Sequence, residues 1–596
     1  MIRYIFLSLF FFASQYIIKA TDFNISCDND LEAAVNLINK GAEMHLKLAP
    51  HHYYIKERIV AKANLSIFSS GATISFYTDK YEQSEIHKVV GNHKVFALKS
   101  PLTTFPLFYD SKGNLLRLST SVVEGMEVNY IDGDIIAPDS YTSGVEIKIP
   151  ISSNLRHLIN KTFSKSFGYI DCGWQVVDFK LDHSDSRYFY CTTLNACRTK
   201  DFNYDKNYYK KQVRFVLYNV EIKDDFIYYN DEFLFIPQNI GTVYCINHSQ
   251  YGTQSPSITT YSNFELKGVN LVGFDGLYIH SGLYNKCEII DCKFYNCLGY
   301  ALRIDKKNLK GVMISNIKNC IFEFCSIHTN KCLLLYSMFD NRNCINLSNC
   351  TLSRYPSGCV DYKNPDGLIF VDGDVSVIEN VVYNTCRCHL YFNRGKILAK
   401  GNILYNNSKF NSFKQRNLSS DFGFIYCNHV FDNSQDALNN SLHNIIIDGN
   451  LIYGAYGYQP SARGIMIDNG RGDVICRNNV IFDTDSYSMA SRDAHSFISS
   501  SSVRNIFEEN ILGEKYMLAS GSEVPEKDFA ISNNNILLGN NKNVKTRIRT
   551  KQEDTVLPLQ SKIYCIDGKV IISKADYRKL KKLKNWKNVK KFFLIK

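Results

Sequence analysis

The chain has 596 residues, of which 45% are apolar and 21% are charged, and its formal net charge is +11. This length is enough for more than one structural unit, and the apolar content excludes an intrinsically disordered chain. After residue 20 no apolar run is long enough to cross a membrane as a helix, so we expect no transmembrane segment.

The first 20 residues have the pattern of a secretory signal peptide. Arg3 precedes an apolar run over residues 4–18, and Ala20 supplies the small residue of a cleavage site. We therefore assign residues 1–20 to a signal peptide and expect the mature protein to be secreted or periplasmic. No cysteine follows residue 20 directly, so a lipoprotein anchor is not indicated.

Residues 100–245 predict an inserted antiparallel β-sandwich. The segment Leu107–Leu118 has the pattern of a hairpin that turns around Lys112-Gly-Asn114. Further strand-like segments follow at Phe167–Trp174, Arg214–Asn219 and Phe233–Pro237.

Between residues 246 and 545 one short motif repeats: Asn or Asp, followed by apolar β-forming residues. Most copies start 21–31 residues apart, with one gap of 48, and they begin at Asn270, Asp291, Asn319, Asn349, Asn380, Asn402, Asn450, Asn479, Asn510 and Asn535. A strand unit that repeats at this period cannot bury its own apolar face, so the copies must stack as a solenoid. Asn tolerates the left-handed backbone of a corner, and stacked amides can bond to the rungs above and below.

The 19 cysteines fall partly into columns of this repeat. Cys292, Cys320 and Cys350 each follow a ladder residue, and Cys297 and Cys325 share a second position. We interpret these columns as free thiols that fill the interior as small apolar side chains. The spacing of Cys386 and Cys388 does not match a zinc site, so we predict no metal and no cofactor.

Residues 546–596 predict a basic C-terminal tail. From Lys574 to Lys596, lysines alternate with apolar residues that would form one side of an amphipathic helix: Leu580, Leu583, Trp586 and Phe592. We expect this helix to cover the open end of the solenoid.

The ladder resembles that of right-handed parallel β-helix proteins of the pectate-lyase-like superfamily. In this resemblance Leu31–Gly41 corresponds to a capping helix and residues 46–55 and 64–68 to the first strands, so that 21–99 form the N-terminal cap and first turns and 246–545 the main β-helix. The stretch from Tyr218-Asn219 to Pro237 is similar to the insertion of some β-helix glycoside hydrolases. The resemblance implies an all-β fold, a right-handed parallel β-helix with an inserted antiparallel β-sandwich. Such folds carry lyases, hydrolases, isomerases and binding proteins, so the fold leaves the chemistry open.

Most rungs contain a second strand whose centre is apolar and whose C-terminal end is charged. These ends predict a polar strip along one edge of the solenoid, made of His280, Arg303, Asp305, Asp372, Arg394, Asp468, Arg492 and Asp493. Neighbouring rungs would place these side chains ~5 Å apart and next-but-one rungs ~10 Å apart. An extended polymer could bind along such a strip.

Two segments resemble motifs of β-helix glycosidases. Arg463–Asp473 is similar to their Gly-Ile-x-x-Asp-Asp-Gly segment, with Asn469 in place of the second acid, and Asp421–Tyr426 is similar to their Asp-x-Gly-x-Ile-Tyr segment. The resemblance implies that Asp468 and Asp421 are the catalytic carboxylates. Their positions relative to the glycines differ by ~20 Å along a straight strand, so they can meet only if the chain bends. The residues expected to hold substrate are Arg463, Arg394, Arg492, His495, Asp372 and Asp493.

These patterns predict an exported enzyme that cleaves a polysaccharide or oligosaccharide by hydrolysis with paired carboxylates. Two alternatives stay open: a polysaccharide lyase that uses Arg394 or Arg492 as its base, and a glycan-binding surface protein without catalysis. The positive charge suits an acidic glycan better than a nucleic acid in an exported chain, so we expect no nucleic-acid partner.

Overall fold

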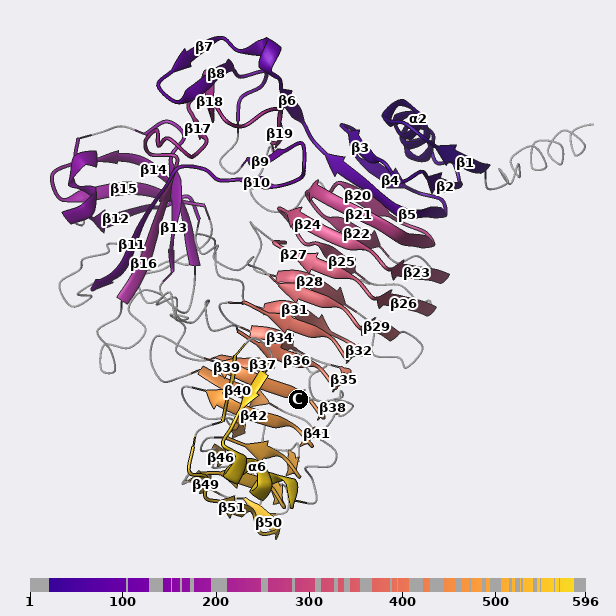
Figure 1. Ribbon diagram of the computed structural model, residues 1–596, viewed down its shortest axis with the longest axis vertical. Helices are drawn as coiled ribbons and strands as arrows, with labels where there is room; N and C mark the ends of the chain where they lie inside the picture. The colour runs from indigo at the N-terminus through magenta and orange to yellow at the C-terminus, as the bar shows by residue number, and fades with distance from the viewer. Residues whose placement is uncertain are drawn as a thin grey trace, which may run out of the picture.

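In the computed structural model the chain forms a right-handed parallel β-helix with antiparallel sheets attached beside its N-terminal rungs (Figure 1). The structure describes residues 21–583 except 103–105, 128–142, 152, 161–162, 172–175, 195–211, 248–255, 281–283, 306–311, 326–330, 337–343, 354–366, 386–387, 394, 407–421, 429–443, 456–461, 471–472, 485–488, 494–504, 514–516, 520–525, 527–528, 540–543, 547, 562 and 567–568. The proposed signal peptide therefore lies outside the described residues.

Three parallel sheets run the length of the solenoid, one strand of each per rung. Sheet 1 consists of β4 Ile59–Ala61, β20 Ile258–Thr260, β22 Leu277–His280, β25 Leu302–Asp305, β28 Lys331–Tyr336, β31 Gly367–Asp372, β34 Cys388–Phe392, β37 Phe422–Asn428, β40 Ala462–Gly470, β43 Met489–Asp493, β46 Met517–Ala519 and β49 Val544–Thr546.

Sheets 2 and 3 join through the long strands β5 Leu65–Phe76 and β21 Phe264–Phe274. Sheet 2 adds β1 Thr21–Ile25, β2 Met44–Leu48, β23 Tyr284–Ile290, β26 Val312–Lys318, β29 Cys344–Ser348, β32 Val375–Ile378, β35 Lys396–Lys400, β38 Asn444–Asp448, β41 Asp473–Arg477, β44 Ile506–Glu508, β47 Ile531–Asn533 and β50 Arg549–Gln552. Sheet 3 adds β3 His52–Ile55, β24 Lys293–Cys297, β27 Ile321–Glu323, β30 Thr351–Ser353, β33 Val381–Tyr383, β36 Ile403–Tyr405, β39 Leu451–Ala455, β42 Val480–Thr484, β45 Ile511–Leu512, β48 Ile536–Leu538 and β51 Thr555–Leu557.

The asparagine ladder is confirmed at the corner between sheets 2 and 3, and it is fully buried. From Asn380 to Asn510, each Nδ2 donates to the Oδ1 of the next ladder residue at 2.9–3.1 Å, and Asn535 continues the chain to Asp554. The same Oδ1 atoms also accept from backbone N–H groups, as Asn479 does from Asn450 at 3.0 Å. The ladder thus satisfies buried backbone groups that the corner would otherwise leave unpaired.

The structure corrects which residue makes the corner. The left-handed backbone falls one position before the buried ladder residue, at Glu379 (φ 56°), Asn478 (φ 55°) and Asn534 (φ 54°), whereas the ladder asparagines are not left-handed. The residues that the sequence grouped as one ladder therefore belong to two different columns. Asp291, Asn319 and Asn349 are left-handed corner residues, and the cysteine that follows each of them occupies the ladder column. Asn270 belongs to neither column, because it pairs with Lys293 on the outer side of sheet 3.

The predicted cysteine columns are confirmed as buried free thiols. Cys350 accepts the N–H of Cys320 and donates its own N–H to Asn380, so the cysteines continue the ladder toward the N-terminus. Every cysteine whose side chain the structure describes is free, including Cys297 and Cys325 of the second column. Burial raises the pKa of the Cys292 thiol well above its usual range, which keeps it neutral.

Helix α2 (Asp28–Asn39) caps the N-terminal end and buries Leu31, Ala34, Val35 and Ile38, as expected. At the other end the expectation was wrong. Helix α6 (Lys574–Lys581) lies on the side of the last rungs, where Leu580 packs with Tyr453 and Phe482 of sheet 3. The outer side of sheet 3 offers this helix an apolar surface, since Leu451, Val480 and Ile511 belong to the same buried cluster as Leu580. Trp586 and Phe592 lie outside the described residues.

The antiparallel part begins at Asp79, earlier than the expected residue 100, because its early strands pair with late ones across the insertion. One four-stranded sheet contains β6 Asp79–Tyr81, β9 Leu107–Asp110, β10 Leu115–Leu116 and β19 Val243–Ile246, and the other β7 Lys88–Val90, β8 His93–Ala97, β17 Tyr228–Tyr229 and β18 Phe233–Pro237. A six-stranded sheet contains β11 Thr120–Glu127, β12 Glu146–Pro150, β13 Phe167–Asp171, β14 Val176–Ser184, β15 Tyr188–Thr193 and β16 Gln212–Tyr218. The three sheets share one apolar core, which includes Phe96, Phe108, Tyr169 and Val216.

The remaining described elements are short. They are the 3₁₀ helices η1 Gln83–Glu85 and η3 Ser153–Leu158 and the antiparallel pair β52 Tyr564–Ile566 and β53 Lys569–Ile571. The parallel rungs continue past the expected boundary at residue 545, since β50 and β51 pair with β47 and β48. Among the described helices, none combines the length and apolarity that a membrane span needs.

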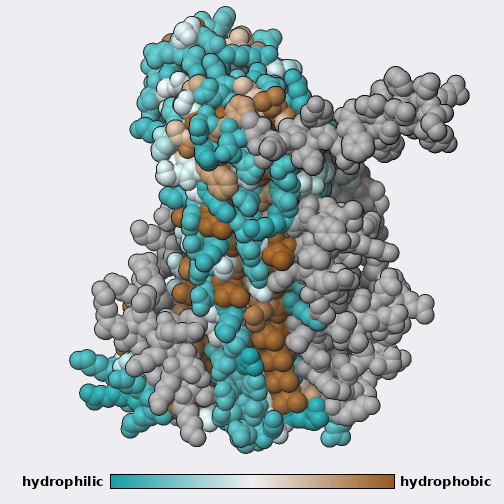
Figure 2. Space-filling model, turned by 90° about the vertical axis from the view of Figure 1, so that its right-hand side faces the viewer, coloured by the Kyte–Doolittle hydropathy of each residue, from teal (hydrophilic) through white to brown (hydrophobic). Residues whose placement is uncertain are grey.

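The outer face of sheet 2 changes character along the solenoid (Figure 2). One outward column begins with Glu265, Glu288, Asn316, Asn346 and Ser376 and continues, in register, as Leu398, Ile446, Ile475, Ile506 and Ile531. Figure 2 shows brown, apolar strips running along the lower half of this side of the molecule.

Candidate functional site

The C-terminal edge of sheet 1 presents one polar or aromatic residue on each of nine consecutive rungs. Strand register places these residues in a single column, here called the edge strip: Tyr261, His280, Asp305, Tyr336, Asp372, Asn393, Asn428, Asp468 and Arg492. For His280, Asp305 and Asp372, whose side chains the structure describes, strand alternation gives an outward direction, because their neighbours Ile279, Ile304 and Val371 face the buried core. At ~4.8 Å per rung the strip extends for roughly 38 Å.

The first rungs of the edge strip combine an exposed ring with an ion pair. Tyr261 is 49% exposed and stacks on His280, with ring centroids 4.9 Å apart. Asp305, on the next rung, accepts a hydrogen bond from Arg303 at 2.5 Å, and that guanidinium lies 5.2 Å from the ring of Tyr278. Burial lowers the pKa of His280, an effect that Asp305 opposes and Arg303 reinforces, so the imidazole is neutral at neutral pH.

The middle of the edge strip contains a carboxylate and an amide in contact. Asn393 donates from Nδ2 to Oδ2 of Asp372 at 3.3 Å, and only 7% of Asp372 is exposed. On β31, β34 and β37, the residue two positions before the strip residue is aromatic, and these rings form a second column. Phe370 stacks on Tyr391 at 5.1 Å, and Tyr391 contacts Tyr426 at 5.3 Å.

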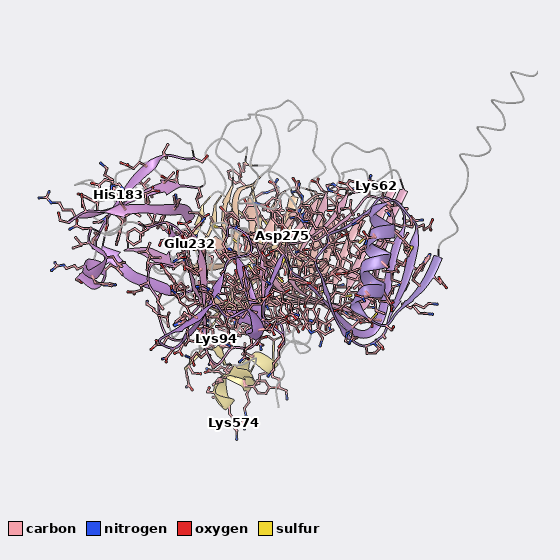
Figure 3. All side chains as sticks on the ribbon, turned by 90° about the horizontal axis from the view of Figure 1, so that it is seen from above. Lys62, Lys94, His183, Glu232, Asp275 and Lys574 are labelled. Carbon is pink, nitrogen blue, oxygen red and sulfur yellow. The ribbon has the colours of Figure 1, made fainter. Side chains whose placement is uncertain are left out.

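Asp275, labelled in Figure 3, is a separate buried carboxyl two residues before the start of β22, at the opposite end of that strand from His280. Burial raises its pKa to about 7, although the charge of Arg58 acts in the opposite direction. A Cβ at Gly299 would come within 2.2 Å of the Asp275 carbonyl oxygen, so this corner is tightly packed. Asp275 can therefore keep a proton near neutral pH, but it is not part of the edge strip.

Register places Asp468 next to Arg492 on β43 and next to Asn428 on β37. The following register shift pairs Asp493 with Gly470, so Asp493 leaves the column. Asp372 lies three strands from Asp468, as the sequence suggested. The structure describes only the backbone of Asp468, Arg492 and Asp493.

Other predicted residues are not brought to the edge strip. Arg463 pairs with Gly423, five positions before Asp468, and is only 4% exposed; strand alternation turns it away from the face that carries Asp468. Arg303 lies two positions before the strip residue Asp305, in register with Tyr278. Asp421, Arg394 and His495 lie outside the described residues. Phe422, next to Asp421, pairs with Ala462, six positions before Asp468, which is ~20 Å along a strand.

The sequence placed Arg394 in the strip, one residue away from the position that the register gives. Val371 pairs with Phe392, so Asn393 lies opposite Asp372. Sequence reasoning also missed the second column of rings. The signal was present, because an aromatic residue stands two positions before the strip residue in several strands: Tyr278, Phe370, Tyr391 and Tyr426.

Within the described part of the chain, no three His, Cys, Asp or Glu side chains gather in a way that could hold a metal ion.

No known protein family and no curated protein matches the sequence. Solved structures that match the fold include the tailspike gp61 of Pseudomonas phage phi297, at 9% identity and a TM-score of 0.24, covering 89% of this chain and 74% of that one. They also include the catalytic domain of a GH87 α-1,3-glucanase in complex with nigerose, at 9% identity and a TM-score of 0.23, covering 75% of this chain and 99% of that one.

Proposed function

We propose that the protein is an exported glycoside hydrolase that binds an extended glycan along the edge strip and cleaves it with Asp468. The observation that carries the proposal is the register, which places nine polar or aromatic residues in one column on consecutive rungs, among them carboxylates, amides, a neutral imidazole and an exposed tyrosine ring. A sugar presents apolar ring faces and hydroxyl edges, so it matches such a mixture of rings and hydrogen-bonding groups.

In this proposal Asp468 acts beside Arg492, its register neighbour on β43. A neighbouring guanidinium favours the ionised form of a carboxyl, and an ionised carboxylate can serve as nucleophile or base. The segment that leads into β37 contains Asp421, and β37 pairs with β40, which contains Asp468. Phe422, next to Asp421, lies opposite Ala462, ~20 Å along the strand from Asp468, so the proposal does not pair these two carboxyls and leaves the second carboxyl unassigned.

A second candidate function is glycan binding without cleavage. It is favoured by a specific observation: the two strip carboxylates with described side chains already have protein partners, Asp305 with Arg303 and Asp372 with Asn393. Carboxylates engaged in this way position hydroxyl groups or stabilise the strand edge, and they are poorly suited to accept a proton from water.

The deciding experiment is the substitution Asp468→Asn, which keeps the shape and removes the charge. On a glycan from a panel of neutral and acidic polysaccharides, we expect kcat to fall ~10²–10⁴-fold, the range for a catalytic acid or base, while the Kd for the glycan stays within a few-fold. Asp231→Asn is the matched control, because that side chain is 62% exposed on the inserted sheets.

Near wild-type turnover by the Asp468→Asn variant would exclude Asp468 as the catalytic group. Binding without any cleavage by the wild-type protein would favour the second candidate. A product with a new carbon–carbon double bond would instead indicate elimination, the lyase chemistry. For export, the proposal expects the mature chain recovered from the secreted or periplasmic fraction to begin at Thr21.

A further inference from the structure

A cavity of about 620 Å³ lies where the inserted sheets meet the first rungs of the β-helix, on the outer face of sheet 3 and away from the edge strip. Three separate parts of the chain form its walls. The first turns contribute His52 and Thr73, the β9–β10 hairpin contributes Lys112 to Leu115 and then Arg117, and the later rungs contribute Asn270, Val272, Lys293, Tyr295, Asn296, Glu323 and Phe324. This volume is in the usual range for small-molecule sites.

The hairpin wall is fixed in place before any ligand binds. The carboxylate of Asp110 accepts the N–H groups of Lys112 and Asn114 at 2.8 Å each, and it also accepts Nδ2 of Asn114 at 2.9 Å. Tyr54 donates its hydroxyl to the Ser111 carbonyl at 2.8 Å, which ties the hairpin to the first rungs.

Gly113 makes the closest approach between the hairpin and the β-helix. Its backbone is left-handed (φ +81°), and a Cβ there would lie 2.6 Å from Cγ1 of Val272. Its carbonyl accepts Nδ2 of the buried Asn296. The two walls of the cavity therefore keep a fixed separation, and a fixed separation is what allows a site to select a ligand by size.

The lining has a net positive charge. Lys112, Arg117 and Lys293 contribute three cations against the one carboxylate of Glu323. Within the described residues, no salt bridge engages Lys112 or Lys293, whereas the Glu323 carboxylate accepts a hydrogen bond from the Tyr383 hydroxyl at 3.2 Å. His52 adds no charge, because burial lowers its pKa and it is hydrogen-bonded to Ser75 at 2.7 Å.

The remaining groups are those that recognise a sugar. The amides of Asn114 and Asn270 and the hydroxyl of Thr73 can donate to or accept from ligand hydroxyls, and the ring of Tyr295 supplies an apolar face. A dedicated phosphate site is usually built from converging backbone N–H groups or a helix N-terminus. Here strand residues and the turn of the β9–β10 hairpin form the walls, and the turn N–H groups of Lys112 and Asn114 are already bonded to Asp110. A lining carboxylate would also repel a doubly charged anion.

We propose that this cavity binds a carboxylated sugar, the hexuronate unit of an acidic glycan, with Lys112 and Lys293 paired to the carboxylate and Glu323 accepting a sugar hydroxyl. The site is separate from the edge strip and does not depend on catalysis there. It would give the protein a second point of attachment to an acidic glycan, and two linked contacts raise the apparent affinity for a polymer.

The test measures binding of free glucuronate and galacturonate to the full chain by titration calorimetry or ligand-detected NMR. These monosaccharides contain no glycosidic bond, so the result is independent of any hydrolysis. We expect Lys293→Gln and Lys112→Gln each to weaken binding ~10-fold, as expected for loss of one charge-assisted hydrogen bond. Glu323→Gln should tighten binding ~3–10-fold, because it removes a like charge while the Gln Oε1 can still accept the sugar hydroxyl.

Lys400→Gln is the matched control, because that lysine is exposed on β35, outside the cavity, and its loss should leave the affinity unchanged. Equal affinity for glucose, or equal effects of Lys400→Gln and Lys293→Gln, would overturn the proposal. Inorganic phosphate that competes as well as the uronates would also overturn it, by showing a general anion site. If the Lys112→Gln and Lys293→Gln variants lose uronate binding but cleave glycan at the normal rate, the cavity proposal is supported and the edge strip proposal is unaffected.

Discussion

At the scale of single residues, neighbouring asparagines in the repeat do different work. Asn478 is left-handed and bonds to Asp448 near the surface, whereas Asn479 is buried and joins the ladder. The sequence shows both as Asn, so it could predict that a ladder exists but could not say which column carries it. Whether an asparagine is buried or left-handed depends on which side of the corner faces the core, and the residue type alone does not determine its φ angle.

This difference predicts that substitutions at the two adjacent positions change the stability of the fold by different amounts. Asn479→Ala leaves the N–H and Nδ2 of Asn450 without their acceptor, and each buried group left unpaired costs ~1–3 kcal/mol. Asn478→Gly should be close to neutral, because glycine adopts the left-handed backbone without strain. Thermal unfolding of the two variants measures this. An equal loss of Tm in both would mean that the ladder bonds do not stabilise the corner.

Asp275 predicts a pH dependence of stability. Its carboxyl has a pKa raised from 3.8 to about 7 in the folded chain, so the folded state holds a proton that the unfolded state loses. The corresponding stabilisation is present below about pH 4 and is lost as the pH rises through about 7. At 1.36 kcal/mol per pH unit, the rise from 3.8 to about 7 corresponds to a loss on the order of 4 kcal/mol.

The measurement is the Tm of wild type and Asp275→Asn at pH 5 and pH 8. Asn resembles the protonated form at both pH values, so the variant should lose less stability than wild type between them. A wild-type Tm that falls no more than the variant's would contradict a raised pKa for Asp275. Asp231→Asn, exposed on the inserted sheets, should behave as wild type.

At the scale of elements, the sequence predicted strand identity well and register less well. Apolar centres and polar ends marked the strands of sheet 1, and the hairpin around Lys112-Gly-Asn114 is present as β9 and β10. The prediction was off by one residue at β34, where Asn393 and not Arg394 lies opposite Asp372. Arg463 is buried, although its motif suggested a substrate contact, because it lies five positions before Asp468 on the same strand and alternation therefore places it on the opposite face.

The cavity beside the β9–β10 hairpin illustrates a second limit. Its lining comes from residues as far apart as His52 and Phe324. The hairpin turn at Lys112–Asn114 and the repeat at Asn270 were visible in the sequence, but nothing in the sequence places them together. Only the fold brings the hairpin against sheet 3, through the contact of Gly113 with Val272. Sites of this kind depend on long-range packing, and periodicity in one chain does not reveal them.

At the scale of the whole molecule, a stacked ring ladder on sheet 3 connects the C-terminal helix to the solenoid. Tyr383, Tyr405, Tyr453 and Phe482 stack at 5.0–5.6 Å, one ring per rung. The helix α6 and the strand segment before it cover the later rings, where Leu580 is fully buried. In a solenoid each rung contacts only its neighbours, so stability can differ along its length. The covered rungs should therefore depend on α6, and the earlier rungs should not.

Leu580→Ala tests this dependence. Removing a buried leucine costs ~2–5 kcal/mol, and the loss should be confined to the rungs under the helix. Native-state hydrogen exchange should show faster exchange at the backbone N–H groups of Asn479 and Asn510 but unchanged exchange at Asn380, whose rung lies before the covered region. Lys582→Ala, at an exposed position just past α6, is the control and should leave all three unchanged. Equal acceleration at Asn380 would show that the solenoid unfolds as one unit and that α6 stabilises the whole of it.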